Sequence, residues 1–316
     1  GDPGLIFIDK INKMHSLHDK IYATNPCGEQ PLLAYESCVL GSINLSKFVN
    51  NKKIDWERLG RVVEIGVHFL DNVIDANDYV VKEIEEMTKL NRKIGLGVMG
   101  WADMLIQLGI SYDSDEALKL AEKVMHFISS RGRLASQKIG KKRGDFPNFR
   151  NSKLAKHFKH QRNATVTTIA PTGTISILAD ASSCIEPIFA MSFVRDVMDG
   201  TRLLETNKYF ESAAKEFGFY NEDLVHEISK TGSIQQLKHI PTNVKKIFVT
   251  AFDIKPEWHV KMQAAFQKYV DNGVSKTINL AESATKDDVK RIYLMAYKLG
   301  CKGITIFRYG SKGKQV

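Results

Sequence analysis

The stretch IGLGVMGWADMLIQL, residues 94–108, places a short apolar run directly before a helical pattern. The run IGLGV (94–98) has the length of a strand and does not alternate between apolar and polar residues, which is typical of a strand covered on both faces. Comparable runs predict further strands, which we place at 165–170, 188–194, 247–252, 274–280 and 303–307.

Helical patterns lie between these runs. From 55 to 75, apolar residues recur at three- and four-residue spacing, which predicts an amphipathic helix. In the last predicted helix, Thr285 is followed by Asp288, a pattern close to a capping box. Strands that alternate with helices predict an α/β fold with mostly parallel strands and functional residues on the loops at strand ends. The other helices are expected at 79–90, 100–108, 115–142, 206–217, 255–272 and 285–299.

The composition excludes several classes of protein. The chain has 316 residues, 43% of them hydrophobic, and a net charge of +9, which is ordinary for a globular protein and unlike a disordered tail or a collagen repeat. Its four cysteines are too few for a disulfide scaffold. No uncharged apolar run reaches the roughly 18 residues of a membrane span, and no signal peptide is seen. We therefore expect a soluble, cytoplasmic protein.

The positive charge is concentrated in residues 138–162, which contain nine Lys or Arg residues and one acidic residue. A patch that binds nucleic acid is one interpretation, and a solvated protein surface is the other. Few aromatic residues are interleaved with the basic ones, so stacking on single-stranded bases is poorly supported. We favour the solvated surface.

The segment TNPCGEQPLLAYESCVLGSINLS (24–46) contains the clearest candidate for chemistry. In an extended chain, Asn25, Cys27 and Glu29 point to the same side, so an amide, a thiol and a carboxylate could share one small space. Such a set could orient a substrate, react with it and move protons. The alternative is a polar loop that happens to contain a cysteine. A second thiol, Cys38, has no partner at metal-binding spacing, so a redox role is the better interpretation.

The segment IAPTGTISIL (169–178) is a second candidate, because a strand-like run enters a turn with Gly173 and hydroxyls at 172, 174 and 176. A helix that begins there would direct unpaired N–H groups at an anion. The pattern is consistent with a phosphate-binding loop or with an ordinary turn. It is not a Walker motif, because no Gly-Lys-Ser/Thr ending is present.

Two other patterns are expected not to be functional sites. Residues 95–100 match the G-x-G-x-x-G pattern of dinucleotide-binding proteins, but a loop and a long helix follow where that motif requires a second strand. We expect these glycines to allow tight packing inside the sheet. The pair His15 and His18 is expected on a surface helix, because no further ligands cluster nearby. No metal site is predicted.

Seven segments closely resemble one family, the catalytic chains of ribonucleotide reductases, and within it the adenosylcobalamin-dependent class II enzymes of the dimeric type. NPCGE combined with PTGTIS at this separation is highly specific. The resembling segments are GDPGLIFIDKIN (1–12), NPCGEQPLLAYESCVLGSINL (25–45), RKIGLGVMGWADML (92–105), APTGTIS (170–176), SSCIEPIFA (182–190), MQAAFQKYVDNGVSKTINL (262–280) and LGCKGITIFRYGS (299–311).

The resemblance implies a ten-stranded α/β barrel in which Cys27 lies at the tip of a finger loop. There it would carry a thiyl radical that takes the 3′ hydrogen of the ribose, as part of deoxyribonucleotide synthesis for DNA. Asn25 and Glu29 match residues that bind and deprotonate the ribose hydroxyls, with Glu29 as general base and then acid. Cys38 matches one of two thiols that become a disulfide as the 2′ oxygen leaves as water. The substrate phosphates would bind Pro171, Thr172, Gly173, Thr174, Ile175 and Ser176.

The choice of class depends on Thr305 and Ile306, which stand where class I chains carry adjacent tyrosines that relay a radical. Without phenols there, a radical generated in place by adenosylcobalamin is favoured. A class I large subunit is the alternative, and a non-catalytic split or truncated barrel half is another.

The resemblance also implies that residues 1–316 form one partial barrel domain, the second half of the barrel. The partner of Cys38 is expected upstream of this sequence, and a C-terminal cysteine pair beyond Val316, whereas Cys184 and Cys301 are expected to be barrel residues. A ribonucleoside diphosphate, more than a triphosphate, is the expected substrate. Thioredoxin or glutaredoxin is the expected reductant, ATP and dNTP effectors are expected to bind outside this chain, and the parent protein is expected to be a homodimer.

Overall fold

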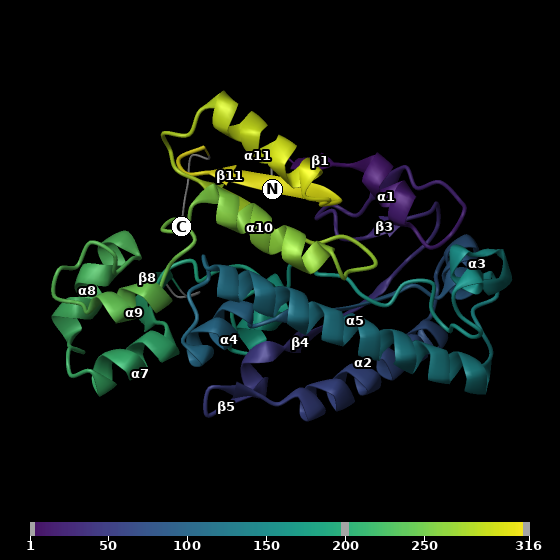
Figure 1. Ribbon diagram of the computed structural model, residues 1–316, viewed down its shortest axis with the longest axis horizontal. Coiled ribbons are helices and arrows are strands. Elements are labelled where there is room, and N and C mark those ends of the chain that lie inside the picture. Colours follow the sequence, from purple (N-terminus) through teal and green to yellow (C-terminus); the bar gives the residue numbers. More distant parts are fainter. Residues whose placement is uncertain (1–3, 197–201, 312–316) are drawn as a thin grey trace.

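The structure is a computed structural model that describes residues 4–196 and 202–311. Residues 1–3 of the first resembling segment lie outside the described residues. Figure 1 shows the long helices α2 (Trp56–Ala76) and α5 (Asp115–Arg143) side by side, with α10 (Pro256–Gln267) and α11 (Lys286–Lys298) forming a second pair.

Five parallel strand segments are neighbours in chain order. Strand β4 (Val39–Asn44) pairs with β7 (Ile94–Met99), and single parallel bridges join β7 to segment 165–170 and that segment to 274–280. The last of these contains β10 (Thr277–Leu280), which pairs in parallel with β11 (Gly303–Arg308). This arrangement confirms the predicted α/β fold, and five parallel neighbours correspond to half of the expected ten-stranded barrel.

Two antiparallel pairings lie at the edge of this half-barrel. Strand β1 (Gly4–Ile6) pairs with β11. The short strands β2 (Ala23–Thr24) and β3 (Pro31–Leu32) pair with each other, so residues 25–30 form the loop at the end of a hairpin. This finger loop, defined as residues 25–30, is the one expected from the resemblance.

Local sequence explains the helices and their packing. The Asp55 side chain accepts a hydrogen bond from the Arg58 N–H at 2.9 Å and caps α2, whose apolar face is buried against the strands. The capping box of Thr285 and Asp288 is present at the start of α11, as predicted. A Cβ at Gly97 would lie 2.2 Å from the Thr168 carbonyl oxygen, so this glycine allows the close strand packing that we expected.

Residues 188–254 differ from the prediction. No extended strand forms at 247–252, where Thr250 makes a single parallel bridge to Ile188. The end of the run 188–194 enters β8 (Ser192–Asp196), which forms an antiparallel hairpin with β9 (Arg202–Thr206). The apolar residues of these runs, including Met191 and Phe248, instead pack with short helices in a separate hydrophobic cluster. Periodicity does not distinguish a buried strand from a short buried helix segment. The single-domain assignment remains a prediction.

The remaining elements connect the strands. They are α1 (Ile8–Met14), α3 (Lys82–Asn91), α4 (Trp101–Leu108), α6 (Gly173–Leu178), α7 (Lys208–Glu216), α8 (Glu222–Thr231), α9 (Thr242–Ile247), β5 (Val49–Asn50), β6 (Lys53–Ile54) and the 3₁₀ turns Leu45–Phe48, Phe149–Asn151 and Lys153–Lys156.

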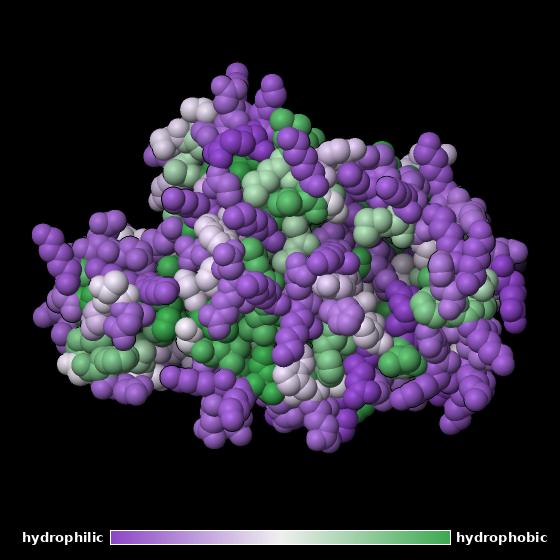
Figure 2. All heavy atoms as spheres, viewed as in Figure 1, coloured by the Kyte–Doolittle hydropathy of each residue, from purple (hydrophilic) through white to green (hydrophobic). Residues whose placement is uncertain are grey.

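Figure 2 shows a mostly hydrophilic face, with hydrophobic residues gathered in its lower middle. No helix in the described part of the chain is long and apolar enough to cross a membrane. Within the basic segment 138–162, Lys138 forms an ion pair with Glu64, and Arg162 forms one with the buried Asp71. Part of the positive charge is therefore balanced within the fold.

Candidate active site

The finger loop is held in one shape by its own backbone. The side-chain oxygen of Asn25 accepts a hydrogen bond from the Gln30 N–H at 2.9 Å, and the Gly28 N–H donates to the Asn25 carbonyl at 3.0 Å. Gly28 has φ +78°, a conformation that favours glycine. Residues 25–30 therefore form a tight loop in which Gly28 allows the chain to turn.

The finger loop is also attached to the half-barrel. The Glu29 carbonyl accepts hydrogen bonds from the Gly273 N–H at 2.8 Å and from the Thr168 hydroxyl at 2.9 Å. A Cβ at position 273 would lie 2.5 Å from the Gly28 carbonyl oxygen, so the loop can approach this strand segment only because residue 273 is glycine. The backbone that carries Cys27 is fixed from two strands.

Cys27 and Glu29 have opposite environments. Cys27 is exposed, whereas Glu29 is 2% exposed, and its Oε2 has no hydrogen-bond partner among the described residues. Cys27 lines a cleft of about 210 Å³, which also contains Lys276 and Thr305. An exposed thiol thus lies two residues from a buried carboxylate with spare capacity to accept a hydrogen bond.

Cys38 immediately precedes β4. Because Val39 pairs with Ile94, the parallel register places Cys38 beside Lys93, a buried residue whose ammonium forms an ion pair with Glu36. Burial raises the pKa of the Cys38 thiol well above its usual range, the positive charge of Lys93 opposes this, and nearby carboxylates, Glu29 among them, raise it further. Cys38 is therefore a protonated thiol at neutral pH.

The loop 171–176 follows strand segment 165–170 and includes the first turn of α6, so a helix begins in this segment, as predicted. Thr172 has φ +56°, and its hydroxyl accepts a hydrogen bond from the Cys184 N–H at 2.7 Å. The Ser176 hydroxyl donates to the Gly173 carbonyl at 3.1 Å. Two of the three hydroxyls expected to serve a phosphate are thus used inside the fold. Thr174 is exposed, and the N–H groups of the first turn have no partner within the helix.

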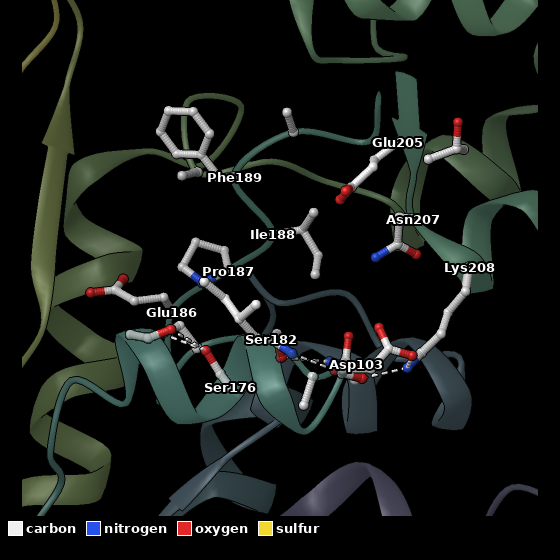
Figure 3. Close-up of a pocket in the computed structure, with 18 of the residues that line it drawn as sticks. Asp103, Ser176, Ser182, Glu186, Pro187, Ile188, Phe189, Glu205, Asn207 and Lys208 are labelled. Carbon is white, nitrogen blue, oxygen red and sulfur yellow. Dashed lines mark hydrogen bonds and ion pairs between the residues drawn. The ribbon is translucent and has the colours of Figure 1, made fainter. Parts of the chain in front are cut away.

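A larger cleft of about 860 Å³ lies beside this loop. Figure 3 shows Ser176 and Glu186 on one side of it and Asp103 and Lys208 on the other. Asp103 accepts a hydrogen bond from the Ser182 N–H at 2.6 Å, and burial raises its pKa.

Residues 182–186 connect the loop 171–176 to strand segment 274–280. The Cys184 sulfur contacts the Ser275 carbonyl at 3.4 Å, and the Glu186 carboxylate accepts a hydrogen bond from the Thr277 N–H at 2.6 Å and pairs with Lys276. No local motif predicts a role for Glu186 or Lys276. Glu186 lies in the segment SSCIEPIFA, which is marked only by its resemblance to the family, and Lys276 lies far from it in the sequence.

The remaining candidates are placed as follows. Cys184 and Cys301 are buried free thiols in the hydrophobic core. His18 is exposed, but His15 follows the end of α1 and is buried, so the expectation of a surface helix for this pair is wrong. Desolvation lowers the pKa of His15 to about 3, so the ring is neutral. No group of three or more metal-binding side chains is found among the described residues.

Comparisons with known proteins show the family of the chain. The chain is 55% identical over 318 residues to the vitamin B12-dependent ribonucleoside-diphosphate reductase of Thermoplasma acidophilum, covering 100% of this chain and 41% of that protein. It is 48% identical to the protein of that name from Mycobacterium tuberculosis (strain CDC 1551 / Oshkosh), covering 100% of this chain and 46% of that one. The chain thus spans less than half of these relatives.

A solved structure, that of the Actinobacillus ureae class Id ribonucleotide reductase alpha subunit, matches 98% of this chain and 58% of its own with a TM-score of 0.81 and 26% identity. The family described as "Ribonucleotide reductase, barrel domain" matches residues 1–162 and 159–307. These matches cover the finger loop, the parallel strands and the loop 171–176, and the chain therefore belongs to the ribonucleotide reductase family.

Proposed function

We propose that the protein carrying this chain reduces ribonucleoside diphosphates to 2′-deoxyribonucleotides through a thiyl radical on Cys27. The observation that carries this proposal is the finger loop, which presents an exposed thiol two residues from the buried carboxylate of Glu29. Relatives at 48–55% identity are named ribonucleoside-diphosphate reductases, which supports the diphosphate as substrate.

The proposed reaction uses three side chains of the finger loop and two further thiols, those of Cys38 and of a second cysteine. The Cys27 sulfur takes the hydrogen atom from C3′, while Glu29 accepts the proton of the 3′ hydroxyl and Asn25 helps to hold the ribose hydroxyls. The 2′ oxygen leaves as water, and Cys38 and a second thiol supply two electrons and two protons and become a disulfide. Cys27 then returns its hydrogen atom to C3′ and Glu29 returns its proton to the 3′ oxygen, so the radical and the carboxylate are both regenerated.

The state of Cys38 suits this role. Because burial holds its pKa well above the usual range, Cys38 is protonated at neutral pH and can donate hydrogen as the 2′ oxygen leaves. Cys184 and Cys301 are buried in the core, so the second thiol is proposed to come from outside this chain. Re-reduction of the disulfide is assigned to thioredoxin or glutaredoxin.

The residues around Cys27 fit adenosylcobalamin as the source of the radical. The thiol is exposed in a cleft bounded by residues 4–6 and 303–305, so a cofactor at this opening can reach the sulfur. Thr305, in the wall of the same cleft, offers no phenol for a radical relay. Tyr309, which follows β11, packs its ring against that of Phe252, with the ring centroids 5.4 Å apart. When bound, adenosylcobalamin supplies the radical that Cys27 receives.

We place the substrate phosphates at the loop 171–176, which borders the larger cleft through Gly173 and Ser176. The first-turn N–H groups and the exposed Thr174 hydroxyl would contact the phosphate oxygens. The parent protein is proposed to be a cytoplasmic homodimer, with ATP and dNTP effectors bound outside this chain.

The test is the cofactor requirement of the complete protein that carries this chain. We expect it to reduce CDP when supplied with adenosylcobalamin and a dithiol reductant, with no second subunit, and to prefer CDP to CTP. A requirement for a radical-generating partner subunit would instead identify a class I enzyme. Absence of reduction under both conditions would favour the non-catalytic half.

The basic segment 138–162 provides a separate test of the nucleic-acid alternative. Replacing its exposed lysines 141 and 142 by Gln should leave CDP reduction unchanged, because they lie on the far end of α5 and do not line either cleft. Salt-dependent binding of DNA that is lost in this variant would support the alternative.

A further inference from the structure

Lys276 is a buried cation between the two clefts. Its side chain is fully enclosed, and its ammonium forms an ion pair with Glu186, donates to the Thr277 carbonyl at 2.7 Å and lies 3.0 Å from His259 Nδ1. An ammonium group has three N–H donors, and these three acceptors match them. Lys276 also lines the cleft of Cys27, whereas Glu186 lines the larger cleft.

His259 adds no charge to this cluster. Its Nε2 lies 3.0 Å from the Ala251 carbonyl, which can only accept, so Nε2 carries the hydrogen and Nδ1 accepts from Lys276. Burial, together with the charge of Lys276, holds the pKa of His259 well below its usual range. Lys276 is therefore the positive member of the cluster and Glu186 the negative one.

Glu186 lines the larger cleft together with Ser176 of the loop 171–176. Its side chain is 26% exposed, and Figure 3 shows it on the same side as Ser176 of the loop 171–176. Lys208 lies on the opposite side and pairs with Asp180 at 2.6 Å. Lys276 is thus the cation that balances Glu186.

The charged residues that line the larger cleft are mostly acidic, although we place a diphosphate there. Its lining includes four carboxylates, and Lys208 is the single lysine or arginine among the described residues that line it. Like charges repel strongly where water is partly excluded, so an unbalanced carboxylate beside the loop 171–176 would oppose an anion. The four carboxylates belong to Asp103, Asp180, Glu186 and Glu205.

We propose that Lys276 is a charge-compensating residue of the substrate site: by neutralising Glu186 from behind the cleft wall, it allows a nucleoside diphosphate to bind beside the loop 171–176. This inference rests on the proposed function and adds a determinant of substrate affinity. Lys276 acts through Glu186 and is a positioning residue, not a catalytic one.

Three variants of the complete protein test this proposal by equilibrium binding of CDP, with cytidine as the uncharged control ligand. We expect Lys276→Met to bind CDP at least tenfold more weakly, because Glu186 becomes unbalanced. Glu186→Gln should bind CDP several-fold more tightly, because the positive charge of Lys276 is then unopposed. The double variant should return to within about threefold of the wild type. Cytidine affinity should be unchanged in all three.

If Lys276 had a purely structural role, the three variants would rank differently in their affinity for CDP. If Glu186→Gln weakens CDP binding, or if the double variant is no better than Lys276→Met, the proposal is overturned. Should Lys276→Met fail to fold by circular dichroism, Glu186→Gln alone decides, since only charge compensation predicts tighter binding. Failure of the wild type to bind CDP would overturn the proposed function itself, an outcome distinct from a wrong order among the variants.

Discussion

The two candidate loops are built in different ways. The finger loop, residues 25–30, is fixed by backbone hydrogen bonds and by the contact of Gly273 with Gly28, where no Cβ would fit. The loop 171–176 is held mainly by hydroxyl groups, through Thr172 and the bond of the Ser183 hydroxyl to the Pro171 carbonyl at 2.9 Å. A Cβ at Gly173 would meet nothing within 4 Å.

The difference matches the tasks proposed for the loops. Hydrogen-atom transfer requires that the sulfur be held in one place, and a loop locked by backbone contacts provides that. An anion site needs N–H and hydroxyl groups that can adjust to a ligand, and open space beside Gly173 permits this. Substitutions in and around each loop test this contrast.

The largest effect is expected at the tip of the finger loop. Cys27→Ser should reduce turnover below detection, because a serine hydroxyl does not form the required radical, while CDP affinity stays within about threefold of the wild type. Cys301→Ala, at a buried thiol that lines neither cleft, is the control and should keep turnover per folded molecule. Turnover by Cys27→Ser would contradict the assignment.

The next effect concerns the close approach behind the finger loop. Gly273→Ala should lower the free energy of unfolding by about 3 kcal/mol and reduce turnover, because the new Cβ meets backbone and not a movable side chain. Gly173→Ala, in open space, should change stability by no more than about 0.5 kcal/mol. Denaturant unfolding of both variants gives the comparison, and equal losses would remove the contrast between the loops.

A smaller loss is expected in the loop 171–176. Thr172→Val keeps the shape of the side chain but leaves the buried Cys184 N–H without its acceptor, which should cost about 2 kcal/mol of unfolding free energy. Thr174→Val, at an exposed position, should leave stability within about 0.5 kcal/mol and weaken CDP binding. Calorimetry and CDP titration of the two variants separate these effects. If Thr174→Val lowered stability and Thr172→Val did not, the hydroxyl used inside the fold would be that of Thr174 and not that of Thr172.

The smallest expected effect is a change of folding stability with pH that arises from Lys302, near the strand segment that holds the finger loop. Lys302 donates to the carbonyls of Asp271 and Asn272, next to Gly273, and desolvation lowers its pKa from 10.5 to about 8. Between these values the unfolded chain binds more protons than the folded one, so this residue makes stability rise with pH, by about 1 kcal/mol from pH 8 to 9.

Unfolding of the wild type and of Lys302→Met at pH 7, 8 and 9 measures this contribution. The unpaired carbonyls add an offset that does not depend on pH, so the stability of the wild type relative to the variant should increase with pH. A constant difference would show that Lys302 keeps its ordinary pKa in the folded state.

Sequence reasoning succeeded where the signal was local. The capping box at Thr285, the strand at 94–98 and the tight loop around Cys27 all depend on residues close together in the chain, and the structure confirms each one. It was less successful where apolar runs have two solutions, as at 247–252, where only Thr250 forms a parallel bridge and Phe248 packs in a separate hydrophobic cluster. It also failed at His15, because spacing does not report burial.

The family, the parallel α/β fold and the candidate thiol and carboxylate could be predicted from the sequence, because they follow from motifs and periodicity within short windows. The occupied hydroxyls of the loop 171–176 and the cation that balances Glu186 became evident only in the folded chain. Glu186 and Lys276 are 90 residues apart in the chain. Contacts over such separations depend on how the strands are ordered in the half-barrel, which no local pattern encodes.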